Sequence, residues 1–269
     1  MNGIFSADLY RMKKGKSLWI VLISAVLITF LISLLLPVSV SVSSASPELM
    51  AEMTDVQELQ QSLLANMGPS FVNEMAGQNV AFFLFLPIIL AAFCADFTLQ
   101  TYKNTLSFFS NRKSVYISRF LLTAVLCLLV KLVLVLSAVV IGILFFSTAG
   151  FTGVFFLELL KGLLLQIPIY LGTISLTCCL IAFFKKSNPI TAVYLLGTMT
   201  ITIAFEMIRA MRPGLQWILL FDPLTAASLV NVPGALSGGE IALCLGFFTA
   251  LFLVSMFVGI RHFEKSDLH

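Results

Sequence analysis

The chain has 269 residues, of which 59% are hydrophobic and only 11% are charged. A soluble domain carries charge on about 25% of its positions, so this composition cannot cover a soluble globule of this size. The net charge is +3, and in a membrane protein the placement of charges is more informative than their sum. The solvent is therefore a bilayer. The length allows six or seven helical spans of about 20 residues each, with no large soluble domain.

Residues 1–16 predict an amphipathic helix at the membrane interface. Ile4, Phe5 and Leu9 recur at helical spacing against Asp8 and Arg11. The apolar run that follows, residues 17–40, is about twice as long as the apolar region of a signal peptide. We therefore expect it to be retained as the first membrane span.

Residues 41–79 are polar and predict an extracellular helix after the first span. Pro47 follows Ser46 as a helix start, and Gly68 with Pro69 predicts its end.

The rest of the chain predicts five more spans, so residues 17–269 form one six-span, all-α domain. These spans are expected at about 80–97, 120–146, 154–184, 189–208 and 240–260. Between the last two, residues 209–239 contain three prolines and are too interrupted for a straight span. We expect this segment to lie in the outer interface.

An even number of spans places both termini on one side of the membrane, and the basic residues indicate which side. With cytoplasmic termini, the cytoplasmic segments carry 12 of the 16 Lys and Arg residues. The sequence therefore predicts a multi-pass protein of the cell (plasma) membrane with both termini in the cytoplasm.

Several chemistries have no support in the sequence. Gly15-Lys16-Ser17 looks like the end of a phosphate-binding loop, but Tyr10 stands where that loop requires Gly. The two histidines lie in the C-terminal tail, and the five cysteines lie inside apolar blocks without metal-ligand spacing. We expect no catalytic site, no metal site and no nucleic-acid partner.

Ionisable residues inside apolar blocks are the candidate functional positions. Lys131 falls near the bilayer midplane, where a cation costs at least about 2.5 kcal/mol unless it faces protein, water or an anion. It is a candidate for the translocation path, and internal pairing or snorkelling is the alternative. Glu158 and Lys161 are three residues apart and are expected to pair. With Glu206 and Arg209 they make up a candidate outer polar cluster, to which Arg212 is adjacent.

The order of several motifs resembles the ABC-2 type permease family, the six-span membrane subunits of ABC exporters. The opening Ala7-Asp8-Leu9-Tyr10-Arg11 resembles the entry helix of small Gram-positive permeases that handle antimicrobial or amphipathic peptides. Asp96, Asn104-Thr105-Leu106 and Arg112 resemble the family's acidic residue, Gly-Thr-Leu run and basic residue, with Asn in place of Gly. Phe221-Asp222-Pro223-Leu224 resembles its hydrophobic-x-Pro signature, and Arg261 to Asp267 resembles its charged ending.

The resemblance implies that residues 98–114 form a coupling helix that docks on a separate ATPase subunit. The candidate coupling residues are Lys103, Thr105, Leu106, Phe108, Phe109, Arg112 and Lys113. ATP and Mg²⁺ would be bound by that partner, so this chain itself needs no cofactor. A second permease subunit, either a second copy or a related chain, would complete the path, and membrane lipid would surround it. A basic loop lying on anionic lipid is the alternative for this segment.

The expected function is export of small amphipathic peptides or of lipid-like or antimicrobial molecules. The alternative is a secondary transporter or a substrate-capture subunit that is not driven by ATP. Secondary transporters often have matched broken helices in two halves, and the sequence shows no evident duplicated pair of that kind.

Overall fold

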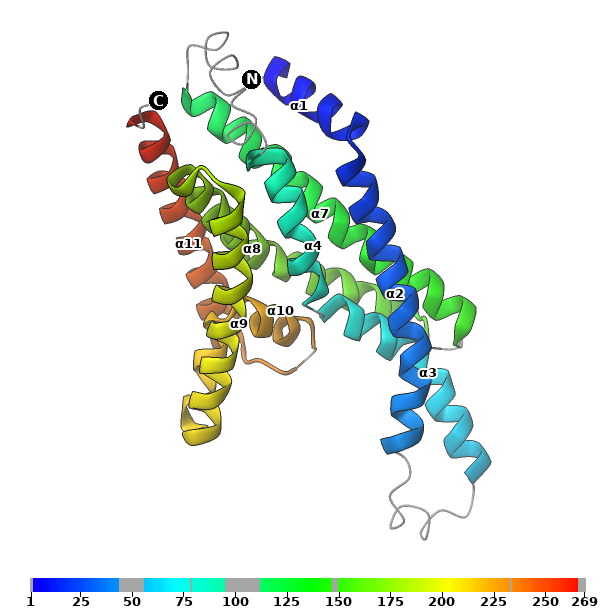
Figure 1. Cartoon of the computed structure of the whole chain (residues 1–269). Coiled ribbons are helices and arrows are strands. Elements are labelled where there is room, and N and C mark those ends of the chain that lie inside the picture. The colour runs from blue at the N-terminus through cyan, green and yellow to red at the C-terminus, as the bar shows by residue number, and fades with distance from the viewer. Residues whose placement is uncertain are drawn as a thin grey trace.

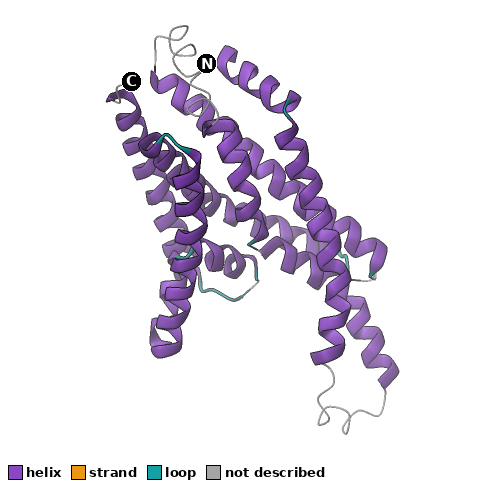
Figure 2. Ribbon diagram, in the orientation of Figure 1, coloured by secondary structure: helices purple, strands orange, loops and turns teal. Residues whose placement is uncertain are grey.

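A computed structural model describes residues 2–43, 56–77, 79–94, 112–146, 150–232 and 234–265. Their regular structure is all helical, without a strand in any of these ranges, which confirms the all-α prediction (Figure 2). The helices, in chain order, are α1 (Asn2–Lys14), α2 (Lys16–Ser43), α3 (Val56–Gly77), α4 (Val80–Ile89), the π-helical turn η1 (Leu90–Cys94), α7 (Arg112–Phe145), α8 (Gly153–Phe184), α9 (Ser187–Met211), the 3-10 helix η2 (Pro213–Phe221), α10 (Pro223–Asn231) and α11 (Gly238–Lys265).

Within the described ranges, five helices are long and apolar enough to cross a membrane: α2, α7, α8, α9 and α11. A sixth span is obtained if the second half of α3, from Met67, is counted together with α4 and η1, which meet it at an angle of 43°. The chain therefore has the make-up of a multi-pass membrane protein with five or six spans.

Helices α1 and α2, the expected amphipathic helix and first span, are separated by a sharp break at Gly15. Figure 1 shows α1 leaving the axis of α2 at this point. The Trp19 indole N–H donates to the Lys13 carbonyl across the break, at 3.0 Å. A Cβ at Gly15 would stand 3.1 Å from the Arg11 carbonyl oxygen, so the tight turn favours glycine.

The predicted helix end at Gly68-Pro69 is wrong, because α3 continues through Pro69 to Gly77. A proline inside a helix costs about 3 kcal/mol in isolation. Here the residues beyond it are held by packing against α7, and Phe71 and Met75 are fully buried. Tertiary contacts therefore outweigh the local signal. The second half of α3 is part of the core rather than of a separate outer helix.

Helix α7 begins eight residues before the predicted span, at Arg112 instead of 120. The additional turns are polar in sequence, but Tyr116 and Arg119 within them are fully buried. The Tyr116 ring packs edge-on against Phe93 and Phe263. Contacts with η1 and α11 thus keep this part of the chain helical.

Helices α8 and α11 pack closely through small residues. A Cβ at Gly172 would stand 2.8 Å from the Phe248 carbonyl oxygen of α11. The hydroxyls of Ser175 and Ser255 are hydrogen-bonded across the same interface. Small side chains let two backbones approach, which is how membrane helices gain packing energy without a hydrophobic driving force.

Residues 213–231 form a short helical hairpin between α9 and α11, where the sequence predicts an interrupted interfacial segment. Figure 1 shows its second arm, α10, lying beside α8. Leu224, Ala226 and Ala227 of α10 are buried, and the helix packs on both α8 and α3. The segment is therefore interrupted as predicted, but α10 lies in the protein core rather than along its surface.

Candidate functional site

Lys131 lies in a buried polar junction where four helices meet. Its side chain is 3% exposed, and its Nζ donates to the Ala76 carbonyl at 2.6 Å. Ala76 is in the last turn of α3, where carbonyls have no partner within the helix and the helix dipole is negative. A lysine ammonium suits this position on both counts. The candidate path residue therefore has a direct protein partner from another helix.

Gln166 of α8 is the centre of the same junction. Its Nε2 donates to the Ala76 carbonyl at 3.0 Å and to the Ala227 carbonyl at 2.8 Å, while its Oε1 accepts from the Tyr170 hydroxyl at 2.8 Å. Lys131 Nζ lies 5.6 Å from the centre of the Tyr170 ring, within cation–π range. Ala227 belongs to α10, so this one side chain joins α3, α8 and α10. We call Lys131, Gln166 and Tyr170, with the carbonyls of Ala76 and Ala227, the central junction.

Close backbone approaches and one more hydrogen bond fix α10 beside the central junction. The Asn231 side-chain amide donates to the Asn73 carbonyl of α3 at 2.9 Å. A Cβ at Gly162 of α8 would overlap the Asn231 side chain, and one at Gly77 would stand 3.5 Å from Ser228. Helix α10 is thus seated in a space that glycines on two helices leave open.

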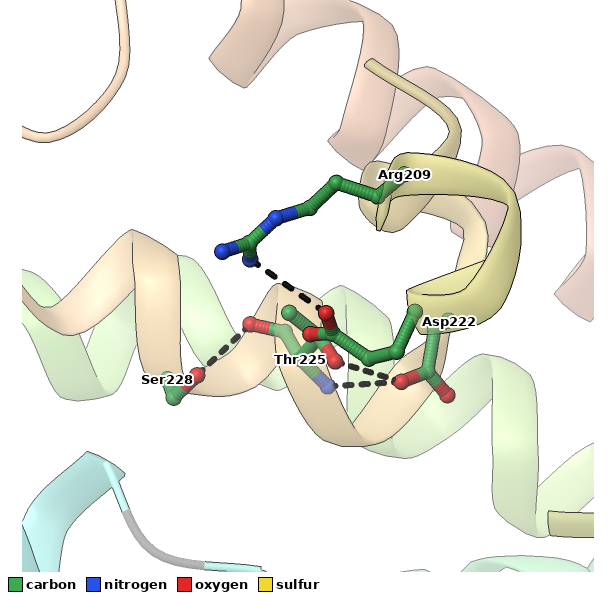
Figure 3. A network of polar contacts seen from close by, with 5 residues as sticks. Arg209, Asp222, Thr225 and Ser228 are labelled. Carbon is green, nitrogen blue, oxygen red and sulfur yellow. Dashed lines mark hydrogen bonds and ion pairs between the residues drawn. The ribbon is translucent and has the colours of Figure 1, made fainter. Parts of the chain in front are cut away.

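Asp222 stands directly before α10 and is fully buried, and its carboxylate accepts hydrogen bonds on both oxygens. Figure 3 shows the two from Thr225. One oxygen accepts from the Thr225 backbone N–H at 3.1 Å and from the Thr225 hydroxyl at 2.6 Å. The other accepts from the Thr202 hydroxyl of α9 at 3.0 Å and from the Leu224 N–H at 3.4 Å. With Pro223 in the first helical position, this is an N-cap that also joins α9 to the hairpin. The motif noted in the sequence has a structural role here.

The four residues of the expected outer polar cluster do not come together. Arg209 pairs with Glu206 at 3.4 Å, and both side chains are half-exposed. Arg209 is labelled in Figure 3, where a dashed line marks its ion pair. The expected pair of Glu158 with Lys161 is wrong, because the ion pairs of the described residues do not include it. Both side chains are exposed. An exposed pair gains too little to offset the ordering of two long side chains.

Three residues of the expected outer polar cluster line two different cavities. Glu158 and Lys161 line one of about 150 Å³. Arg209 lines another of about 260 Å³, together with Gln216, Trp217 and Glu240. The two cavities share only Leu229 and Leu236 in their walls.

A second set of polar contacts joins α1, the start of α7 and the end of α11. Asp8 lies 3.6 Å from the fully buried Arg119 and 3.4 Å from Arg11. Lys113 pairs with the Glu264 carboxylate at 3.4 Å, and Arg112 donates to the Glu264 carbonyl at 3.0 Å. We call these contacts the terminal clamp. Figure 1 shows the three elements at the same end of the molecule.

The terminal clamp includes two of the candidate coupling residues, Arg112 and Lys113, at the start of α7. The other candidates, Lys103, Thr105, Leu106, Phe108 and Phe109, lie outside the described residues. Their coupling role stays a prediction, as does a role for Lys131 in a translocation path.

Neither the potential metal ligands nor comparison with known proteins assigns a function to the chain. In the parts of the chain that the structure describes, His, Cys, Asp and Glu side chains form no group that could hold a metal ion. No protein-family model matches this chain, and no curated protein matches it. The motifs and contacts described above therefore carry the functional proposal.

Sequence reasoning missed Gln166 and the Asp8–Arg119 pair. Gln166 is an amide in the middle of an apolar block, and an uncharged polar residue at that depth could have been recognised as needing a partner. From the sequence, Asp8 is expected only on the polar face of the amphipathic helix. Its pairing depends on how α1 folds back on α7, which no local pattern encodes.

Proposed function

We propose that this chain is the membrane subunit of an ATP-driven ABC exporter, as the family resemblance implies. The observation that carries the proposal is the terminal clamp. It fastens the start of α7, which includes the last residues of the expected coupling segment, to α1 and α11. If a partner moves that segment, the movement would be transmitted through α7 to the other helices, because the start of α7 is fastened to them. The chain has no phosphate-binding loop of its own, so ATP would be hydrolysed elsewhere.

In this proposal both termini and the coupling segment face the cytoplasm. A separate ATPase binds ATP and Mg²⁺, and two permease subunits, either identical or related, enclose the path. Small amphipathic peptides or lipid-like or antimicrobial molecules are the expected cargo. The described bundle supports the proposed dimer, because its centre is filled by the core and by the central junction.

The test is to purify the tagged chain from its native membranes and to measure ATP hydrolysis in the eluate. We expect co-purifying ATPase activity, and we expect Phe108→Ala with Phe109→Ala to remove it. Buried aromatic side chains contribute about 2 kcal/mol or more each in such interfaces. Lys103→Gln is the matched variant for the lipid-surface alternative, because it removes charge and keeps the aromatic pair.

Three outcomes would contradict the proposal. One is an eluate without ATPase activity, and another is full activity after loss of both phenylalanines. The third is a larger effect of Lys103→Gln than of the double Phe variant, with a salt dependence typical of headgroup attraction. That last result would assign the segment to the lipid surface.

The central junction supports a second candidate, secondary transport. Two interrupted helical segments, the bent α3–α4 pair and the η2–α10 hairpin, each present a backbone carbonyl to Gln166. Discontinuous helices that meet at a polar site are typical of secondary transporters. The two segments differ in form, one being a bend and the other a short hairpin.

Reconstitution distinguishes the two candidates. A secondary transporter would move substrate in liposomes that contain only this chain and an ion gradient. An exporter subunit would do so only when the ATPase and ATP are added.

A further inference from the structure

An open apolar groove of about 660 Å³ lies between α2 and α7. One face of α2 forms a wall, through Trp19, Leu22, Ile23, Val26, Leu27 and Phe30. Their spacing of three and four residues places them in one stripe along the helix. The end of α7 closes the groove, where the Phe145 ring packs edge-on against Phe30 at 5.8 Å. Most of these side chains are exposed, so the groove is not filled by the chain itself.

The length of this groove matches one leaflet of a bilayer. From Trp19 to Phe30 is eleven residues, or about 16 Å along the helix axis. Half of a hydrocarbon core of about 30 Å is about 15 Å. Such a groove accommodates the chain of a lipid whose headgroup lies at the end marked by Trp19, and it ends near the middle of the membrane.

The Trp19 end of the groove is strongly basic. Lys13, Lys14 and Lys16 are all exposed there, around the break between α1 and α2. The Trp19 N–H, held by the Lys13 carbonyl, ties the top of the groove to these lysines. The nearby carboxylate of Asp8 is directed to Arg119 and Arg11 instead. The charge at the mouth is thus positive and open to an anion.

We propose that this groove is a binding site for an anionic phospholipid. One acyl chain lies along α2 between Trp19 and Phe30, and the phosphate lies among Lys13, Lys14 and Lys16. A tryptophan at the level of the headgroups is typical of membrane proteins. The site is independent of the proposed transport function and of which side of the membrane α1 occupies.

Trp19 provides a direct probe, because the chain has only two tryptophans. In a Trp217→Phe chain, all tryptophan fluorescence comes from Trp19. The protein is reconstituted in phosphatidylcholine vesicles, and quenching is measured with phosphatidylglycerol or phosphatidylcholine brominated on the acyl chains. We expect the brominated phosphatidylglycerol to quench with about fivefold higher affinity or more, since a single lysine near an anionic headgroup already favours binding about fivefold.

Two pairs of variants separate the site from general attraction to the membrane. Replacing Lys13, Lys14 and Lys16 by Gln should bring the affinity ratio to about one. The matched control replaces three other lysines by Gln and should keep the preference. Those control lysines are the exposed Lys186 and Lys265 and the half-buried Lys185.

The second pair tests the groove itself. Val26→Phe fills it and should remove the preference while leaving ordinary quenching by phosphatidylcholine. Val125→Phe, on an exposed face of α7 outside the groove, should change nothing.

An affinity ratio of one in the Trp217→Phe chain would overturn the proposal. So would a preference that survives both the lysine replacements and Val26→Phe. A Trp19 that no brominated lipid quenches would also overturn it, and would assign the groove to contact with a second protein copy.

Discussion

Helices α8 and α9 follow each other in the chain, and both are candidate spans, but they are built differently. Helix α8 has buried side chains along its whole length, including Gln166, Tyr170 and Thr173. Helix α9 buries only Ile190 and Tyr194. Its tyrosine hydroxyl donates to the Phe82 carbonyl at 2.8 Å, and its other contacts lie mainly toward the hairpin.

The difference shows that apolar composition alone does not identify a core helix in a membrane protein. Both helices meet the length and hydropathy of a span. Helix α9 also contains Gly, Ala and Thr residues, but in α8 small and polar residues face other helices, as at Gly172, Ser175 and Gln166. Lipid is as apolar as leucine, so close packing and hydrogen bonds between helices are what favour protein contacts over lipid contacts. The exposed face of α9 is free to meet lipid or a second subunit.

The strongest test of this contrast compares two glycines. Gly172→Ala places a Cβ 2.8 Å from the Phe248 carbonyl oxygen and should destabilise the fold by about 3 kcal/mol. Gly197→Ala in α9 meets no atom within 4 Å and should be neutral or stabilising by about 0.5 kcal/mol. Unfolding in detergent micelles by titration with sodium dodecyl sulfate measures both. Equal losses for the two variants would contradict the assignment of α8 as the core helix.

Removing the centre of the junction should have the next largest effect. In Gln166→Leu the Ala76 carbonyl keeps Lys131, but the Ala227 carbonyl and the Tyr170 hydroxyl lose their partner. We expect a loss of about 2 kcal/mol in the same unfolding assay. Thr198→Val in α9, which removes hydrogen bonds within its own helix, is the control and should cost under about 0.5 kcal/mol. A loss no larger than that of the control would show that the junction contributes little to stability.

The sequence predicted most helices but not which of them pack together or which polar side chains meet between them. The predicted range 154–184 differs by one residue from α8, because Thr152 caps its start and a basic pair follows its end. The error at Pro69 arose because a local stop signal carries no information about the packing of Phe71 and Met75. The central junction could not be foreseen for the same reason. Lys131, Ala76 and Ala227 come from three separate segments, and their meeting depends on the bend after α3 and on the hairpin.

Lys131→Met separates a structural role from a transport role. Stability should change by under about 1 kcal/mol, because Gln166 still satisfies the Ala76 carbonyl and removal of a deep charge lowers the insertion cost. If Lys131 borders the path, export or substrate-stimulated ATP hydrolysis should change in this variant. Normal transport by an equally stable protein would make Lys131 a structural residue only.

The smallest effect is expected at the ion pair on α9. Glu206 and Arg209 are half-exposed, so Glu206→Gln should change stability by less than about 0.5 kcal/mol. Asp222→Asn is the comparison within the same region, since that carboxylate is fully buried and accepts four hydrogen bonds. If Glu206→Gln proved as costly as Asp222→Asn, the half-exposed pair would contribute more than its exposure predicts.

The five cysteines have a practical consequence for determining which way the protein faces. All are free thiols and all are buried. Maleimides react with accessible thiolates, so the native chain should stay unlabelled and can serve directly as the background for accessibility mapping. A cysteine introduced at the exposed Asn188, in the first turn of α9, and another at the exposed Gly239, in the first turn of α11, would then report opposite sides of the membrane.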